Sequence, residues 1–152
     1  MNACLHDWQR TGTRLDVKFV IDDWQGPTDA IVECAHCRRH ALVRLLHWSG
    51  RNLSTRIFAV STLDERAVAV FLRNMKSNYC DLTRHAAEIA ALEASADRTS
   101  GGLIANGPDM TVLSTLEVGE LGGPKIRSWR ESSPDEGDPF WLAIVSRHRQ
   151  HA

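Results

Sequence analysis

The sequence has few of the features that define the simpler protein classes. Among its 152 residues no apolar run approaches the roughly 20 residues of a membrane-spanning helix, and the longest one near the end covers only residues 140–145. The net charge is −1, so the balance indicates neither a strongly basic nor a strongly acidic protein. With only five prolines and ten glycines, the chain is neither collagen-like nor of low complexity. We expect a globular chain without a membrane segment.

Cysteines are also few, at positions 4, 34, 37 and 80. The opening residues MNACLHDWQR lack the basic-then-apolar order of a secretory signal. A chain of this length forms a core without disulfide bonds, so we expect reduced thiols and a cytoplasmic location. Arginine greatly outnumbers lysine, which hints at a GC-rich, bacterial coding sequence.

The length suits a single domain spanning residues 1–152, and the residue pattern predicts an α+β fold. Short apolar or alternating segments, bounded by turn residues, predict a small antiparallel β meander over about 15–61. Residues 41–48 also fit one helical face. A strand is favoured there because the segment is short and Gly50 ends it.

A helical segment packed on this meander is expected over about 63–97. Thr62 and Glu65 have capping-box spacing, and apolar residues then recur at helical intervals. Asp81 could cap a second helix, so the segment is one bent helix or two helices that meet near residue 78. C-terminal strands are expected at 110–118, 125–130 and 140–145. We expect residues 1–13 to be loosely ordered, 98–109 and 131–139 to be loops, and 147–152 to be a basic tail.

The CxxC motif of Cys34 and Cys37 is the one motif that could carry chemistry. Two thiolates on a tight turn between strands can both bind one tetrahedral zinc ion at about 2.3 Å. A strand, a CxxC turn and a second strand resemble one half of a zinc ribbon, although a complete ribbon has a second CxxC and this sequence has none. A second pair of ligands must come from elsewhere in the chain. The candidate zinc ligands are Cys34, Cys37, Cys80 and His85, with Cys4 and His6 as the other available pair. The alternative without metal is that Cys34 and Cys37 are small buried residues or remnants of a lost site.

A thiol–disulfide oxidoreductase is the alternative, with Cys34 as the nucleophile and Cys37 as the resolving thiol. That chemistry needs a helix directly after the motif to lower the thiol pKa, and residues 41–48 would supply it only if helical. Glu33 immediately precedes the motif, and its carboxylate would oppose thiolate formation. The zinc interpretation is therefore preferred.

Charge is unevenly distributed around the motif. Between Glu33 and Asp64 there is no acidic residue, whereas five arginines are present. Guanidinium groups without counter-charges, interleaved with an aromatic ring, suit phosphates and bases or an acidic protein surface. We therefore expect a non-enzymatic binding or accessory protein that contacts a protein or nucleic-acid partner through Arg38, Arg39, Arg44, Trp48, Arg51 and Arg56.

Overall fold

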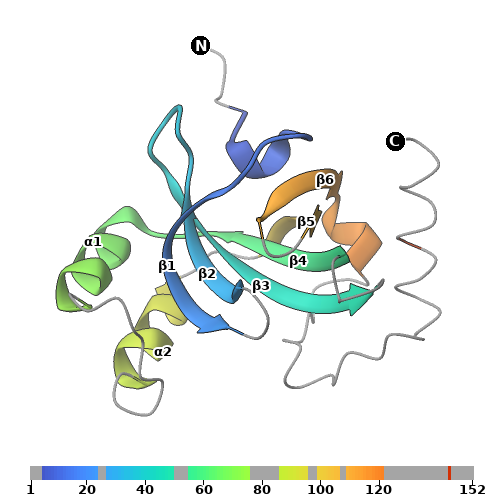
Figure 1. The fold of residues 1–152 in the computed structure, drawn as a ribbon. Helices are drawn as coiled ribbons and strands as arrows, with labels where there is room; N and C mark the ends of the chain where they lie inside the picture. The colour runs from blue at the N-terminus through green and yellow to red at the C-terminus, as the bar shows by residue number, and fades with distance from the viewer. Residues whose placement is uncertain are drawn as a thin grey trace.

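The computed structural model describes residues 5–23, 27–49, 55–75, 86–95, 99–106, 109–121 and 144. Within these residues, six strands form one antiparallel sheet in which each strand pairs with the next along the chain (Figure 1). The strands are β1 (Asp16–Asp23), β2 (Pro27–Glu33), β3 (His40–Ser49), β4 (Thr55–Thr62), β5 (Thr99–Asn106) and β6 (Thr111–Leu116). The helices are η1 (Asp7–Gln9), α1 (Glu65–Asn74), α2 (Ala86–Ser95) and η3 (Val118–Leu121). The α+β class is confirmed, with most of the described structure in the sheet.

The sheet curls until its first and last strands meet at one corner. Residues just before β1 pair with β6: the Gly12 N–H donates to the Val112 carbonyl at 2.7 Å, and the Leu15 N–H donates to the Met110 carbonyl at 3.0 Å. The inner face of the curled sheet therefore encloses a core. Its side chains form one buried cluster with members from β2 to β6, against which the partly buried Val17 of β1 packs, and Trp8 of η1 belongs to the same cluster.

The outer face is covered in two places. Helices α1 and α2 pack over β1, β2 and β3, where Phe19 of β1 meets Phe71 of α1 edge to face at 5.2 Å between ring centres. The side-chain alternation of the strands produces both faces, because Ile31 points to the helices while its neighbours Ala30 and Val32 point inward. A second outer cluster joins β4, β5 and β6 to η3 and the buried Ile144. Neither α1 nor α2 has the length and apolar character that crossing a membrane requires.

The predicted meander over 15–61 is confirmed as β1 to β4, and residues 41–48 are a strand rather than a helix. Both described helices fall within the predicted helical segment, and the proposed joint near residue 78 lies outside the described residues. The helix cap differs from the prediction. Asp64, not Thr62, precedes α1, and its carboxylate accepts the Ala67 N–H at 3.1 Å.

Three expectations are corrected. The loop predicted over 98–109 contains β5, a strand that lies between β4 and β6, because its glycines meet a close neighbouring backbone rather than ending the strand. The N-terminal segment expected to be loose contains η1, whose Asp7 and Trp8 are buried. Ile144 is helical, which contradicts the strand expected over 140–145 at that residue. The elements expected at 125–130, 131–139 and 147–152 lie outside the described residues.

The close approach of β5 to β4 gives a stability prediction. A Cβ atom at Gly102 would lie 2.7 Å from the Phe58 carbonyl oxygen, a backbone atom that cannot yield without shifting the sheet. We expect Gly102→Ala to lower the free energy of unfolding by about 1–3 kcal/mol, measured by urea denaturation. Gly119→Ala is the matched control, because nothing lies within 4 Å of a Cβ at that position. Equal stability losses in the two variants would contradict the prediction.

Candidate metal centre

A tight turn between β2 and β3 carries Cys34 and Cys37. Inside it the Arg38 N–H donates to the Cys34 carbonyl at 2.9 Å, and the Cys34 N–H donates to the Arg39 carbonyl at 2.8 Å. Arg38 has a φ of 65°, in the left-handed region, which allows the chain to reverse within a few residues and enter β3. The two cysteines therefore sit at the two ends of one short turn, and both are thiols.

His6, at the start of η1, reaches this turn from the N-terminal segment. Its Nδ1 atom lies 3.2 Å from the Cys37 Sγ atom. The ligand atoms of His6, Cys34 and Cys37 all lie within 4.8 Å of one another. Around a tetrahedral zinc with bonds of about 2.3 Å, ligand atoms are separated by about 3.7 Å. These three residues thus lie close enough to hold one metal ion.

Helix η1 is held against the turn by a buried carboxylate. Asp7 is 3% exposed, and its Oδ2 atom accepts the Ala35 N–H at 2.9 Å, while Oδ1 lies 3.6 Å from His36 Nε2. The His6 ring stacks on the Trp8 ring with 4.6 Å between their centres. His6 is therefore oriented both by the core residue beside it and by the Asp7 contact to the turn.

The environment of Cys34 favours its thiolate. Burial of this side chain opposes ionisation, but hydrogen bonds from the Cys37 backbone, the His6 side chain and the backbones of His36 and Asp7 outweigh it and lower the pKa to about 6. A thiolate at neutral pH is the form that binds metals. A bound cation would stabilise this thiolate further.

The structure brings Cys34 and Cys37 together with His6. In the sequence analysis His6 belonged to the second candidate pair of ligands, Cys4 and His6. Cys80 and His85 lie outside the described residues, as does Cys4. Two sulfurs and one imidazole nitrogen are donors that suit zinc and other borderline-soft metals. Comparisons of the chain with protein-family models, curated proteins and solved structures found no match. What the chain does must therefore follow from this geometry.

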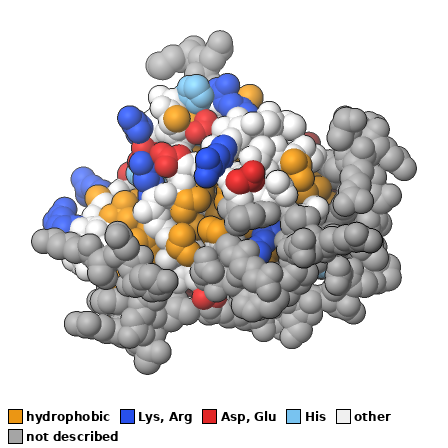
Figure 2. Space-filling model, viewed as in Figure 1, with side chains coloured by type: hydrophobic (Ala, Val, Ile, Leu, Met, Phe, Trp, Pro, Cys, Tyr) orange, Lys and Arg blue, Asp and Glu red, His pale blue; other side chains and the backbone are white. Residues whose placement is uncertain are grey.

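Two of the arginines expected on an exposed basic surface, Arg56 and Arg38, differ from the expectation. Arg56 is 1% exposed and its guanidinium donates to the Pro27 carbonyl at 3.2 Å, so it does not contribute to an exposed surface. Arg38 is exposed but pairs with Glu33 at 2.7 Å, which corrects the expectation that it lacks a counter-charge. Arg39 is exposed and Arg44 half-buried. Arg51 and the side chain of Trp48 lie outside the described part of the chain. Figure 2 shows basic and acidic side chains mixed on the face it presents.

A second polar cluster, which the sequence did not indicate, anchors the base of the turn. His40 Nε2 lies 3.0 Å from a Glu33 oxygen, and His40 Nδ1 lies 2.7 Å from a Glu65 oxygen at the start of α1. Glu65 also accepts the His40 backbone N–H at 2.9 Å. Burial alone would raise the pKa of Glu33, but the Arg38 hydrogen bond and the charges of Lys18, His40 and Arg38 lower it overall. The cluster joins the turn to α1.

The pKa of Cys34 can be tested on metal-free protein. We expect the thiolate ultraviolet absorbance of the wild type, minus that of Cys34→Ser, to titrate with a midpoint near pH 6. Because the pKa of Cys34 lies below the ordinary thiol value of 9.0, its ionisation stabilises the folded state, and this contribution is complete above pH 9.0. That contribution is lost as the pH falls through about 6, so thermal melts of the wild type should show it and those of Cys34→Ser should not. A difference titration centred near pH 9 would contradict the account.

Proposed function

We propose that this chain is a non-enzymatic zinc-binding accessory protein in which the metal fastens η1 to the turn between β2 and β3. The observation that carries the proposal is the convergence of His6 with Cys34 and Cys37, since His6 and Cys37 are 31 residues apart in sequence and their ligand atoms lie 3.2 Å apart. Histidine nitrogen and cysteine sulfur are the ligands of structural zinc sites. A reducing compartment such as the cytoplasm would keep both thiols available for metal.

The proposed role of the metal is to stabilise the fold. Its ligands come from two segments that are otherwise joined by short-range polar contacts, such as the Asp7 carboxylate with the Ala35 N–H at 2.9 Å. Such a site is absent from the unfolded chain, so the free energy of metal binding adds to the free energy of unfolding. Because Trp8 belongs to both η1 and the inner core, fastening η1 also fixes one end of that core.

The oxidoreductase alternative receives less support from the geometry. Its nucleophile would be Cys34, the thiol with the lowered pKa, yet the exposed fraction of Cys34 is 0% and a substrate disulfide could not reach it without local opening. The motif is followed by the strand β3 rather than by a helix whose N-terminus could activate a thiol. Reduction of a small disulfide substrate that is lost in Cys34→Ser would favour this alternative over zinc binding.

A protein or nucleic-acid partner stays part of the proposal. Arg38 and Arg39 are exposed on the turn between β2 and β3 that carries the two cysteines, and a bound metal would hold that turn rigid. Binding of short single-stranded RNA that weakens with added salt and with Arg39→Ala would favour nucleic acid. Absence of RNA binding at low salt would favour a protein partner.

Metal analysis tests the zinc proposal. Protein purified without chelators or a histidine tag is expected to contain about one zinc per chain. His6→Ala and Cys37→Ser should each lose most of that zinc and melt at a lower temperature. His36→Ala is the matched control and should retain it, because His36 is near the site but its Nε2 faces Asp7 at 3.6 Å. Metal-free wild type whose melting temperature does not rise on adding zinc would contradict the proposal.

A further pair of variants separates the two ligand sets. If His6, Cys34 and Cys37 hold the ion, the double variant Cys80→Ser, His85→Ala should retain its zinc. If the set predicted from sequence is correct, this double variant should lose zinc and His6→Ala should keep it. Zinc content per chain, measured by atomic emission on folded protein, decides between them.

A further inference from the structure

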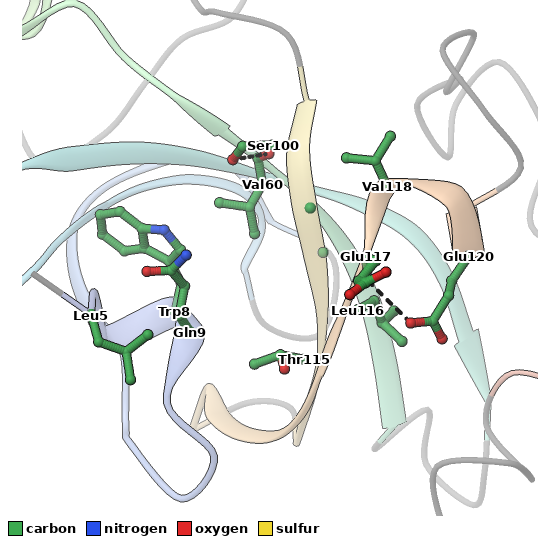
Figure 3. A pocket seen from close by; sticks show the side chains of 12 residues that line it. Leu5, Trp8, Gln9, Val60, Ser100, Thr115, Leu116, Glu117, Val118 and Glu120 are labelled. Atoms are coloured by element: carbon green, nitrogen blue, oxygen red, sulfur yellow. Dashed lines mark hydrogen bonds between the residues drawn. The ribbon is translucent and has the colours of Figure 1, made fainter. Parts of the chain in front are cut away.

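A cavity of about 490 Å³ lies beside η1, within the usual size range of small-molecule sites. One wall is formed by the N-terminal segment, including Trp8 and Gln9, and the opposite side by β5, β6 and η3 (Figure 3). Gly101 and Gly102 of β5 present bare backbone to it. The proposed zinc site does not include this space.

We propose that this cavity binds a small organic cation, an ammonium group attached to an apolar body, and that the metal centre holds one of the cavity walls in place. The first part depends only on the cavity lining. The second part rests on the proposed zinc function, and the experiments below keep the two separate.

The chemistry of the lining selects the ligand class. Apolar surface comes from Trp8, Val60 and Leu116, while Ser100 and Thr115 add uncharged hydroxyl groups. The charged side chains among the described lining residues are Glu117 and Glu120, and no lysine, arginine or histidine is found among them. Glu117 is exposed and Glu120 half-buried, and two carboxylates beside one cavity repel an anion and attract an ammonium group. The apolar walls would hold the hydrocarbon part of such a ligand.

The two carboxylates are held on one side of the cavity. Glu120 lies on η3, and its Oε1 atom accepts the Glu117 N–H at 3.2 Å (Figure 3). This contact spans the short connection between β6 and η3 and holds the Glu120 carboxylate there, while the Glu117 side chain is exposed beside it.

The cavity is connected to the metal centre through one stacked pair of rings. His6 is a metal ligand in the proposed site, and its ring stacks on Trp8 with 4.6 Å between centres and 25° between planes. Trp8 lines the cavity and is 3% exposed. Loss of the metal would release His6 and loosen this wall. By linkage, a cation in the cavity would in turn raise the affinity for zinc.

Three probes of similar shape test the ligand class: phenethylammonium, 2-phenylethanol and 3-phenylpropanoate. Each would be titrated into the zinc-loaded full chain and followed by amide nuclear magnetic resonance. We expect the ammonium probe to shift the Gly101, Gly102 and Thr115 amides, the alcohol to bind more weakly, and the carboxylate to leave them unchanged. Glu117→Gln should weaken binding of the ammonium probe by about threefold and leave binding of 2-phenylethanol unchanged.

Two variants locate the binding. Thr115→Phe places a ring in the cavity and should abolish the shifts. Leu113→Phe is the matched control, because Leu113 is on the same strand, 46% exposed and not part of the lining. The cation proposal is overturned if the carboxylate probe binds as tightly as the ammonium probe, if no probe shifts these amides, or if Thr115→Phe leaves ammonium binding unchanged.

The coupling is tested by repeating the ammonium titration after a chelator has removed the zinc and on His6→Ala. We expect a severalfold loss of affinity in both. Unchanged affinity in a sample shown to have lost its zinc overturns the coupling. If the wild type binds no zinc at all, the proposed function and the coupling both fail, whereas ammonium-selective shifts in that same protein would still support the cavity as a cation site.

Discussion

A buried carboxylate joins the N-terminal segment to the turn after β2. Asp7 accepts the Ala35 N–H at 2.9 Å, and this contact sets η1 beside the two cysteines. His6 is thereby brought to 3.2 Å from Cys37, and Trp8 enters the inner core. The candidate metal centre, one end of the core and one wall of the cavity all depend on this attachment.

The turn beside this attachment favours a thiolate. Cys34 is inclined to ionise, with a pKa lowered to about 6, and the Asp7 carboxylate is buried near it. Backbone N–H groups stabilise these charges, but a divalent cation would do so far more strongly, because charges interact strongly away from water. The chain also tolerates a left-handed residue, Arg38, to form the turn. Strain of this kind persists where the surrounding structure fixes the geometry.

Local patterns predicted much of the fold, and distant contacts explain what they missed. The meander and α1 followed from alternation and helical spacing, and Cys34 and Cys37 came together because one turn holds both. β5 was missed because Gly101 and Gly102 are typical of loops, although here they allow close strand packing. The role of His6 depends on η1 docking from 31 residues away from Cys37. Arg38 pairs with Glu33 across the local turn, whereas the partner of Arg56 is a β2 carbonyl two strands away, a tertiary contact that the sequence alone does not reveal.

The most direct test of the metal centre is X-ray absorption at the zinc edge of the metal-loaded protein. The account predicts at least two sulfur ligands at about 2.3 Å and at least one imidazole nitrogen at about 2.0 Å, with the imidazole signal lost or reduced in His6→Ala. A zinc environment without sulfur, or one that His6→Ala leaves unchanged, would contradict it.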